Sequence, residues 1–211
     1  MSLQSLPPDF FERDPHDVAR DLLGHDLVRR RGDGSLLRGR IVELEVYGGR
    51  YDPASHSSEG PPTERNRAMF GDPGTAYVYL IYGIYYCFNI VTLRQERPSA
   101  LLVRAARPLE GHQKMAEARG LTTADETDGW DDRNLMSGPG KLCQALDIDR
   151  RFDESALDSG ELVVVEGEPV GSDDTRSIDT TPRIGLNPET VGKSAEWEWR
   201  YVVAESDYSS R

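Results

Sequence analysis

The sequence predicts one mixed α+β domain over residues 1–211. The chain is long enough to bury a single sizeable core and short for two. Its content of 37% hydrophobic and 29% charged residues is typical of a globular protein. β-rich runs and helical segments alternate irregularly, without an internal repeat or a linker long enough to separate two domains. We therefore expect strands and helices to share one core.

In the first half of the chain, one helix is predicted ahead of a series of strands. Asp14 is expected to cap this helix and Pro15 to occupy its first position. Residues 48–64 are rich in Gly, Ser and Pro and predict an irregular loop. Runs of β-forming residues predict strands at 27–31, 36–47, 77–81, 84–92 and 100–106.

The second half contains fewer clear elements. The acidic stretch 121–136 has weak periodicity and predicts a loop, and a turn is expected at 95–99. The remaining patterns predict helices at 110–119 and 141–146 and strands at 162–165 and 199–203.

The chain is acidic, and its charge is unevenly distributed. The formal net charge is −12, from 25 Lys+Arg and 37 Asp+Glu. Residues 1–110 contribute −1 (14 against 15) and residues 111–211 contribute −11 (11 against 22). The second half of the chain would therefore repel a polyanionic partner, whereas the first half is nearly neutral and would repel it much less. Acid with only three lysines also fits a protein adapted to molar salt, which screens self-repulsion.

Neither a metal centre nor a membrane anchor is expected. Cys87, Cys143 and four scattered histidines form no disulfide framework and no metal-ligand spacing. No stretch approaches the ~20 apolar residues that a bilayer requires, and the N-terminus lacks the apolar core of a signal peptide. We therefore expect a reduced, cytoplasmic protein without a membrane partner.

Residues 43–47 place two carboxylates on one face of a predicted strand. Because side chains alternate along a strand, Glu43, Glu45 and Tyr47 share that face. Carboxylates on an otherwise apolar strand must be solvated, paired or used in chemistry. A solvated face with cross-strand arginine partners explains them without catalysis. Alternatively, one carboxylate is a general base beside an aromatic wall.

Five of the nine tyrosines fall within ten residues. Aromatic side chains favour strands and cores, and we expect Tyr77 and Tyr85 to be buried. Tyr82 stands at a predicted turn, where a ring is harder to bury and can wedge between stacked bases. Asn89 lies inside an apolar strand, so its amide needs a partner from the protein or from a ligand.

An arginine also interrupts an apolar strand. Arg104 lies in the run Leu-Leu-Val-Arg-Ala-Ala, where a buried guanidinium requires an anionic partner. Glu45 is a suitable partner. A purely structural ion pair explains this pattern equally well.

Taken together, these motifs resemble the alkyladenine (3-methyladenine) DNA glycosylase family. Val46 replaces the alanine of the family's Glu-Ala-Tyr motif, and the last 55 residues agree only loosely, through 183–185 and 199–201. The matching blocks follow the family order across residues 15–155 and comprise 40–47, 55–57, 65–70, 73–83, 89–90, 102–105, 108–111, 137–139 and 141–146.

The resemblance implies a fold and a reaction. The fold is a curved, largely antiparallel sheet flanked by helices, with a protruding β-hairpin. The reaction is hydrolysis of the N-glycosidic bond of alkylated or deaminated purines in duplex DNA, after the damaged nucleotide has been flipped out of the stack. A member of the family is expected to act as a monomer in base excision repair, nucleoid-associated when bound to DNA.

The resemblance also implies a role for each site residue. Glu45 would be the general base that activates water, and Arg104 would hold that water and Glu45. Glu43 shares the strand face but is not the family's base. Tyr82 would fill the gap left in the duplex. The pocket for the flipped base would be formed by Tyr47, Tyr79, His56 and Asn89, with Asn89 excluding the exocyclic amine of guanine.

Water is the only co-substrate that this chemistry requires, so no cofactor is expected. Lys114, Lys141 and Lys193 lie outside the matched motifs, which predicts a monofunctional hydrolase without lyase activity. Two alternatives stay open. A hydrolase of small glycosides or nucleosides would leave Tyr82 without a role, and a non-catalytic damage-binding module would have no need of Glu45.

Overall fold

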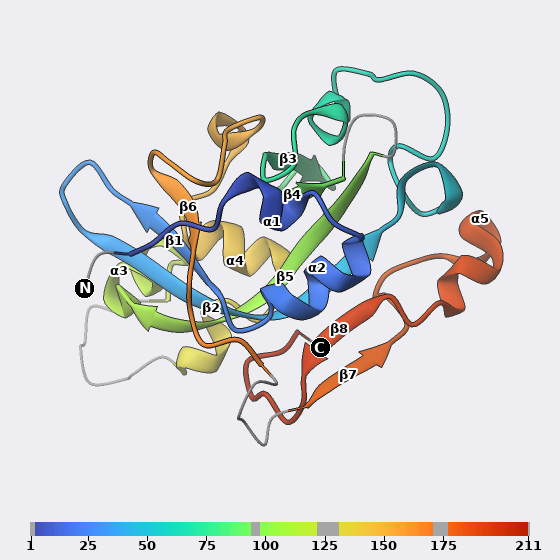
Figure 1. Ribbon diagram of the computed structural model, residues 1–211. Helices are drawn as coiled ribbons and strands as arrows, with labels where there is room; N and C mark the ends of the chain where they lie inside the picture. Colours follow the sequence, from blue (N-terminus) through green and yellow to red (C-terminus); the bar gives the residue numbers. More distant parts are fainter. Residues whose placement is uncertain (1–2, 94–97, 122–130, 171–176, 211) are drawn as a thin grey trace.

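A computed structural model describes residues 3–93, 98–121, 131–170 and 177–210 of the chain (Figure 1). An antiparallel sheet of eight strands forms its centre, and helices pack on both faces of the sheet. This arrangement confirms the predicted α+β class with a largely antiparallel sheet.

Six strands follow one another in the order β3-β4-β5-β2-β1-β6, and β8 pairs with both β2 and β7. Every one of these pairs is antiparallel. The strands are β1 Asp26–Arg30, β2 Leu36–Tyr47, β3 Ala76–Ile81, β4 Tyr85–Thr92, β5 Ser99–Glu110, β6 Leu162–Val165, β7 Ile178–Thr181 and β8 Arg200–Val203.

Strand β2 exchanges one neighbour for another along its length. Residues 36–40 of β2 pair with β1, whereas residues 43–45 pair with β8. Strand β5 accompanies β2 along the opposite edge. The segment that carries the two glutamates is therefore enclosed between β5 and β8, in the interior of the sheet.

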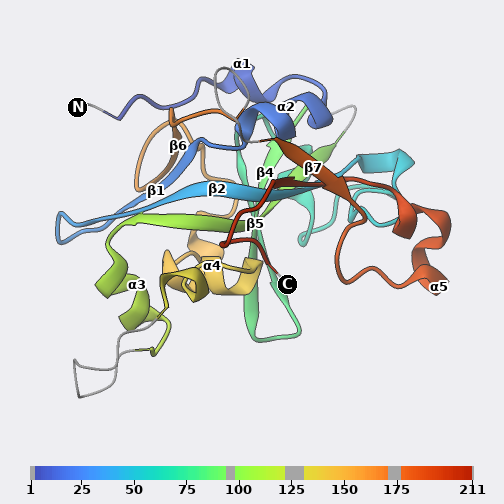
Figure 2. The same cartoon turned by 90° about the horizontal axis from the view of Figure 1, so that it is seen from below.

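Helices cover the sheet from two sides, with α1 and α2 on one face and α3 and α4 on the other (Figure 2). As predicted, the Asp14 side chain caps α2, accepting a hydrogen bond from the backbone N–H of His16 at 2.9 Å, and Pro15 is its first residue. The α-helices are α1 Pro8–Phe11, α2 Pro15–Leu22, α3 His112–Ala118, α4 Pro139–Ala145 and α5 Pro188–Val191.

The second half differs most from the prediction. Strand β5 continues to Glu110, and α3 begins only at His112 because Gly111 adopts a left-handed φ of 86° between them. Strand β7 was not predicted. The expected turn at 95–99 and loop at 121–136 lie partly outside the described residues, which omit 94–97 and 122–130.

The hairpin of β3 and β4 extends away from the rest of the sheet (Figure 2). Its turn is closed by a hydrogen bond from Ile84 N to Ile81 O at 3.1 Å, and Tyr82 and Gly83 between them have φ of 53° and 69°. Positive φ at both positions is typical of a type I′ turn. The turn presents an unusually apolar tip, with Tyr82 82% and Ile84 70% exposed.

One of the two tyrosine burial predictions is wrong. Tyr77 is buried as expected, but Tyr85 is 42% exposed. Tyr85 starts β4 beside the projecting turn, where the helices no longer cover the strand completely. Its side chain lies against Gly140 at the start of α4, where a Cβ added to Gly140 would come within 3.2 Å of Tyr85 Cβ and Cγ.

Candidate active site

Irregular pairing between β2 and β5 brings Arg104 to the two glutamates. Glu43 pairs with Ala105 and Leu44 pairs with Val103, so Arg104 is an extra residue in β5. A bulge of this kind turns a side chain out of the regular alternation, and such bulges are common beside active sites. The guanidinium of Arg104 consequently contacts both carboxylates, with Nε 3.0 Å from Glu43 Oε1 and Nη1 3.2 Å from Glu45 Oε1.

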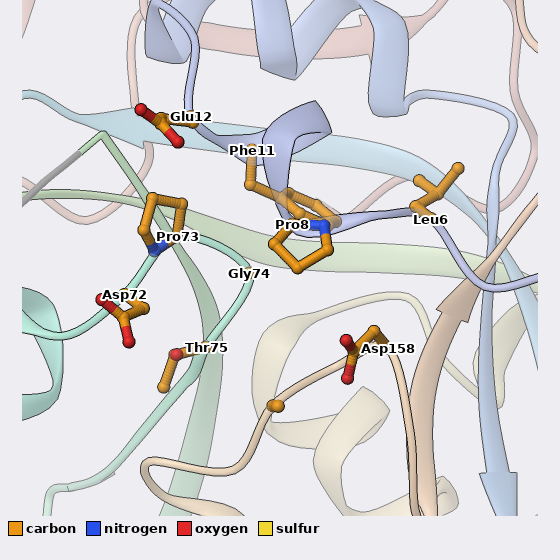
Figure 3. A pocket seen from close by; sticks show the side chains of 10 residues that line it. Leu6, Pro8, Phe11, Glu12, Asp72, Pro73, Gly74, Thr75 and Asp158 are labelled. Atoms are coloured by element: carbon orange, nitrogen blue, oxygen red, sulfur yellow. The ribbon is translucent and has the colours of Figure 1, made fainter.

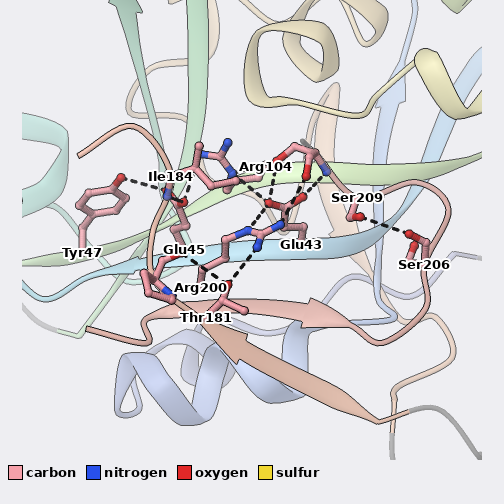
Figure 4. A network of polar contacts seen from close by, with 11 residues as sticks. Glu43, Glu45, Tyr47, Arg104, Thr181, Ile184, Arg200, Ser206 and Ser209 are labelled. Atoms are coloured by element: carbon pink, nitrogen blue, oxygen red, sulfur yellow. Dashed lines mark hydrogen bonds and ion pairs between the residues drawn. The ribbon is translucent and has the colours of Figure 1, made fainter. Parts of the chain in front are cut away.

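Glu45 is fully buried but is not fully hydrogen-bonded (Figure 4). Its Oε1 accepts a hydrogen bond from the backbone N–H of Ile184 at 2.6 Å and faces Arg104. Its Oε2 accepts one hydrogen bond, from the Tyr47 hydroxyl at 3.0 Å. Because each carboxylate oxygen has two lone pairs, Oε2 retains a position for a further donor such as water.

Glu43, two residues earlier, accepts more hydrogen bonds, and all of them come from residues outside the pocket. Its Oε1 accepts from Arg104, from Arg200 Nε at 2.7 Å and from Ser210 Oγ at 2.7 Å. Its Oε2 accepts from the backbone N–H of Ser210. The cross-strand arginine partners that the sequence suggests are therefore present, and they account for Glu43 as a structural carboxylate.

The four residues predicted to form the base pocket come together around one small cavity of about 20 Å³. Tyr47, His56, Tyr79 and Asn89 all line it, together with Tyr77 and smaller side chains. A cavity of this size has room for about one water molecule. The aromatic rings are thus packed closely, and a purine can enter only if they move apart.

His56 is held in the wall of this cavity by its neighbours. Its Nδ1 lies 2.8 Å from the Tyr77 hydroxyl, and its ring packs edge-to-face on Tyr79 with 4.7 Å between centroids. Although its outer edge reaches solvent, enclosure of the ring, with a smaller effect of the Arg65 charge, lowers the pKa of His56 to about 4. The imidazole is therefore neutral at pH 7.

Asn89 finds its partner within the hairpin. The side chain is 3% exposed, and its Nδ2 donates a hydrogen bond to the backbone carbonyl of Tyr77 at 3.0 Å. This bond fixes the orientation of the amide in the pocket wall. The partner required by its burial is thus supplied by the protein.

A larger cavity of about 780 Å³ lies elsewhere, between the N-terminal segment and residues 72–75 (Figure 3). Leu6, Phe11, Asp72 and Asp158 are among the residues lining it. None of the predicted site residues reaches this cavity. The smaller pocket is the better candidate because several aromatic rings line it and one of them, Tyr47, is hydrogen-bonded to the buried carboxylate of Glu45.

Three features of the site are not predicted by the sequence. The Ile184 donor is a backbone N–H, which no residue type reveals. Ser210 belongs to a weakly matching C-terminal segment. Arg183 forms a buried ion pair with Asp52, and the only sequence signal for it is the short matching block 183–185.

Two further findings concern only the described part of the chain. No group of three or more His, Cys, Asp or Glu side chains there is placed to hold a metal ion. Within the same ranges, no helix combines the length and apolar character needed to cross a membrane.

Comparison with known proteins supports one family. Residues 9–207 match the model of the methylpurine-DNA glycosylase family. The chain is 45% identical over 193 residues to a mouse DNA-3-methyladenine glycosylase and 43% identical over 196 residues to a human one, covering 91% and 92% of this chain. It is also 44% identical, over 98% of its length, to a Methanocella arvoryzae protein provisionally named 3-methyladenine DNA glycosylase.

The relatives differ in length. The chain spans 56% of the mouse protein and 63% of the human protein, but 96% of the archaeal one. The match therefore covers nearly all of this chain, including the strand with the two glutamates, the hairpin and the segment around Ile184. On this extent of similarity, the chain belongs to the methylpurine-DNA glycosylase family.

Proposed function

We propose that this chain is a monofunctional DNA glycosylase that excises alkylated or deaminated purines from duplex DNA in base excision repair. It hydrolyses the N-glycosidic bond of a flipped nucleotide with water as the only co-substrate. One observation carries the proposal: the buried carboxylate of Glu45 is hydrogen-bonded through Oε2 to Tyr47, a ring that lines the aromatic pocket.

In the proposed reaction, Glu45 is the general base. Arg104 and Ile184 N–H hold its Oε1, which leaves Oε2 to orient a water molecule and to take its proton. The carboxylate also stabilises the positive charge that develops on the sugar as the base departs. Arg104 maintains this geometry because its guanidinium is anchored to Glu43 on the opposite side.

Base flipping is assigned to the hairpin and the pocket. Tyr82 is the most exposed ring on the projecting hairpin, so it is placed to fill the gap in the duplex. Tyr47 and Tyr79 stack on the flipped base, while His56 completes the wall. The pocket then opens as the base enters, since its closed volume is too small for a purine.

Selectivity is assigned to two sources. Asn89, fixed by its bond to Tyr77, crowds the exocyclic amine of a normal guanine. Cationic alkylated purines are also better leaving groups than normal bases. The three lysines lie elsewhere, and none of them lines the pocket, which supports hydrolysis without strand cleavage. We further propose that residues 1–211 act as one domain, as a monomer in the cytoplasm and on the nucleoid.

The test is base release from duplex oligonucleotides that carry a single hypoxanthine, ethenoadenine or methylated purine, at low and at molar salt. We expect a released base and an alkali-sensitive abasic strand, with no borohydride-trapped adduct. Release from free nucleosides but not from duplex DNA would favour a small-nucleoside hydrolase instead. Binding of damaged duplex without any release would favour a non-catalytic module.

A further inference from the structure

Arg183 is buried between two aromatic rings beside the base pocket. Its guanidinium carbon lies 4.8 Å from the centroid of Tyr47 and 5.1 Å from that of Trp199. Nη2 donates to Asp52 Oδ1 at 2.9 Å, and Nη1 donates to Asp52 Oδ2. Both side chains of this ion pair are completely inaccessible to solvent.

The same arginine is connected to the general base along two routes. Nη1 donates to the backbone carbonyl of Val46 at 2.8 Å, between Glu45 and Tyr47 in β2. The next residue, Ile184, donates its backbone N–H to Glu45 Oε1 at 2.6 Å. One short segment therefore contacts the ring that would stack on the base and the carboxylate that would activate water.

Asp52 extends these contacts to the loop that follows β2. Its Oδ2 accepts from Gly48 N at 3.1 Å, and its Oδ1 accepts from Ala54 N at 3.0 Å. Ala54 and His56 both line the pocket. The ion pair thus joins the C-terminal segment to two parts of the pocket wall, the end of β2 and the loop.

The energetics favour a role in geometry over one in stability. Buried ion pairs contribute little net stability, because desolvation offsets the attraction between the charges. The Nε of Arg183 is moreover buried without a hydrogen-bond partner, which is a further cost. A planar guanidinium, however, can hold a carboxylate in bidentate fashion and stack on a ring at the same time, which lysine cannot do.

We propose that Arg183, held by Asp52, is a positioning residue of the glycosylase reaction. It fixes the Tyr47 ring and the Glu45 carboxylate relative to each other, so that the stacked base and the attacking water are aligned together. This proposal rests on the proposed function, and it assigns Arg183 no contact with DNA.

The test compares Arg183→Lys with a matched control, Arg40→Lys, in single-turnover excision of ethenoadenine from a duplex. Arg40 is likewise buried in a pair with a fully buried carboxylate, Asp26, but lies outside the pocket. Misplacement of reacting groups by about 1 Å costs roughly 10²-fold in rate. We therefore expect Arg183→Lys to slow excision about 10- to 100-fold, and Arg40→Lys to change it less than twofold.

Two readouts separate positioning from a merely structural role. Affinity for undamaged duplex should be unchanged in Arg183→Lys, whereas the fluorescence change of ethenoadenine on stacking should be reduced. In a double-mutant cycle, Arg183→Lys should cost little further rate when Glu45 is already glutamine. If Arg183→Lys is insoluble, Asp52→Asn serves in its place, with a smaller loss in the same direction.

Independent, multiplicative losses in that cycle would overturn the proposal, as would an equal loss in Arg40→Lys. Excision by Arg183→Lys at the wild-type rate would overturn it as well. Failure of the proposed function has a different signature, because the wild-type protein would then release no base from any damaged duplex.

Discussion

Glu43 and Glu45 lie two residues apart on one face of β2, yet their surroundings differ. Both are fully buried, and both contact Arg104. Glu43 accepts four hydrogen bonds, from two arginines and from both polar groups of Ser210. Glu45 accepts from a backbone N–H and from Tyr47, which itself lines the pocket.

The difference shows that burial and charge do not identify a catalytic carboxylate. A carboxylate whose donors are two arginines and a C-terminal serine, as at Glu43, belongs to a structural network. A carboxylate hydrogen-bonded to a ring of the pocket wall, as Glu45 is to Tyr47, is closer to a place where water could be activated. Glu43 anchors Arg104, and we propose Glu45 for the chemistry.

Substitution of Glu45 should reduce excision more than any other change. Glutamine fits the same contacts, since its oxygen can accept from Ile184 N–H while its amide donates to the Tyr47 hydroxyl. It cannot take a proton from water. We expect Glu45→Gln to lower the single-turnover excision rate by about 10³-fold, within the usual range for a general base. Gel-shift affinity for damaged duplex should persist, and loss of binding along with excision would contradict this assignment.

At Glu43 the large effect should fall on stability. In Glu43→Gln, the side-chain NH₂ group would face one of the donors that now bond to the carboxylate. Arg104 and Arg200 would also lose the anion that they share. Removal of one partner from a buried ion pair costs about 3–5 kcal/mol. Urea unfolding of Glu43→Gln should show a decrease of that order in the free energy of unfolding. An unchanged unfolding midpoint would argue against a structural role for Glu43.

Substitution of Tyr82 should have an intermediate effect, which raises stability and lowers the excision rate. A non-glycine residue in the left-handed region costs about 1–2 kcal/mol, and asparagine tolerates that region better than tyrosine. Tyr82→Asn should therefore raise the free energy of unfolding by up to about 1 kcal/mol. It should also slow excision from duplex DNA about tenfold or more, because base–aromatic stacking contributes about 1–3 kcal/mol. Tyr82→Phe, which keeps the ring, should retain excision. Equal losses in both variants would exclude the wedge role.

The smallest effect concerns pH. Partial enclosure of its ring lowers the pKa of His56 to about 4, so the folded protein leaves it neutral until the pH falls through that value. The unfolded chain takes up this proton near pH 6.5, so His56 weakens the fold slightly as the pH falls from 6.5 toward 4. Above pH 5, excision by His56→Asn should follow the same pH profile as wild type. If the excision rate of the wild type changes between pH 5 and 7 and that change is absent in His56→Asn, the imidazole titrates during the reaction.

The sequence predicts the parts of the fold where local pattern and tertiary pairing agree. Residues 36–47 and 162–165 form strands with the predicted bounds, and Asp14 caps its helix. Strand β7 was not predicted because its residues are at most partly buried and its strand conformation depends on pairing with β8. Tyr85 was misplaced because aromatic propensity cannot show that a hairpin projects beyond the helices that would bury it.

The geometry of the site is likewise predictable only where it follows from local pattern. Alternation along β2 correctly places Glu43, Glu45 and Tyr47 on one face, and Arg104 does pair with Glu45. The bulge that directs Arg104 toward the glutamates depends on the register between β2 and β5, and Arg104 is 61 residues from Glu43 in the sequence, so strand periodicity cannot predict it. The contact of Ile184 with Glu45 could not be predicted either, because its donor is a backbone N–H that every residue type except proline has.

The most direct test of the account measures single-turnover excision of ethenoadenine by Glu45→Gln and Glu43→Gln side by side. Both rates are normalised to the folded fraction at the same temperature. We predict that the folded Glu43 variant excises at least tenfold faster than the Glu45 variant, which should lose about 10³-fold. Equal rates in the two folded variants, or a greater loss in Glu43→Gln, would contradict the assignment of Glu45 as the base.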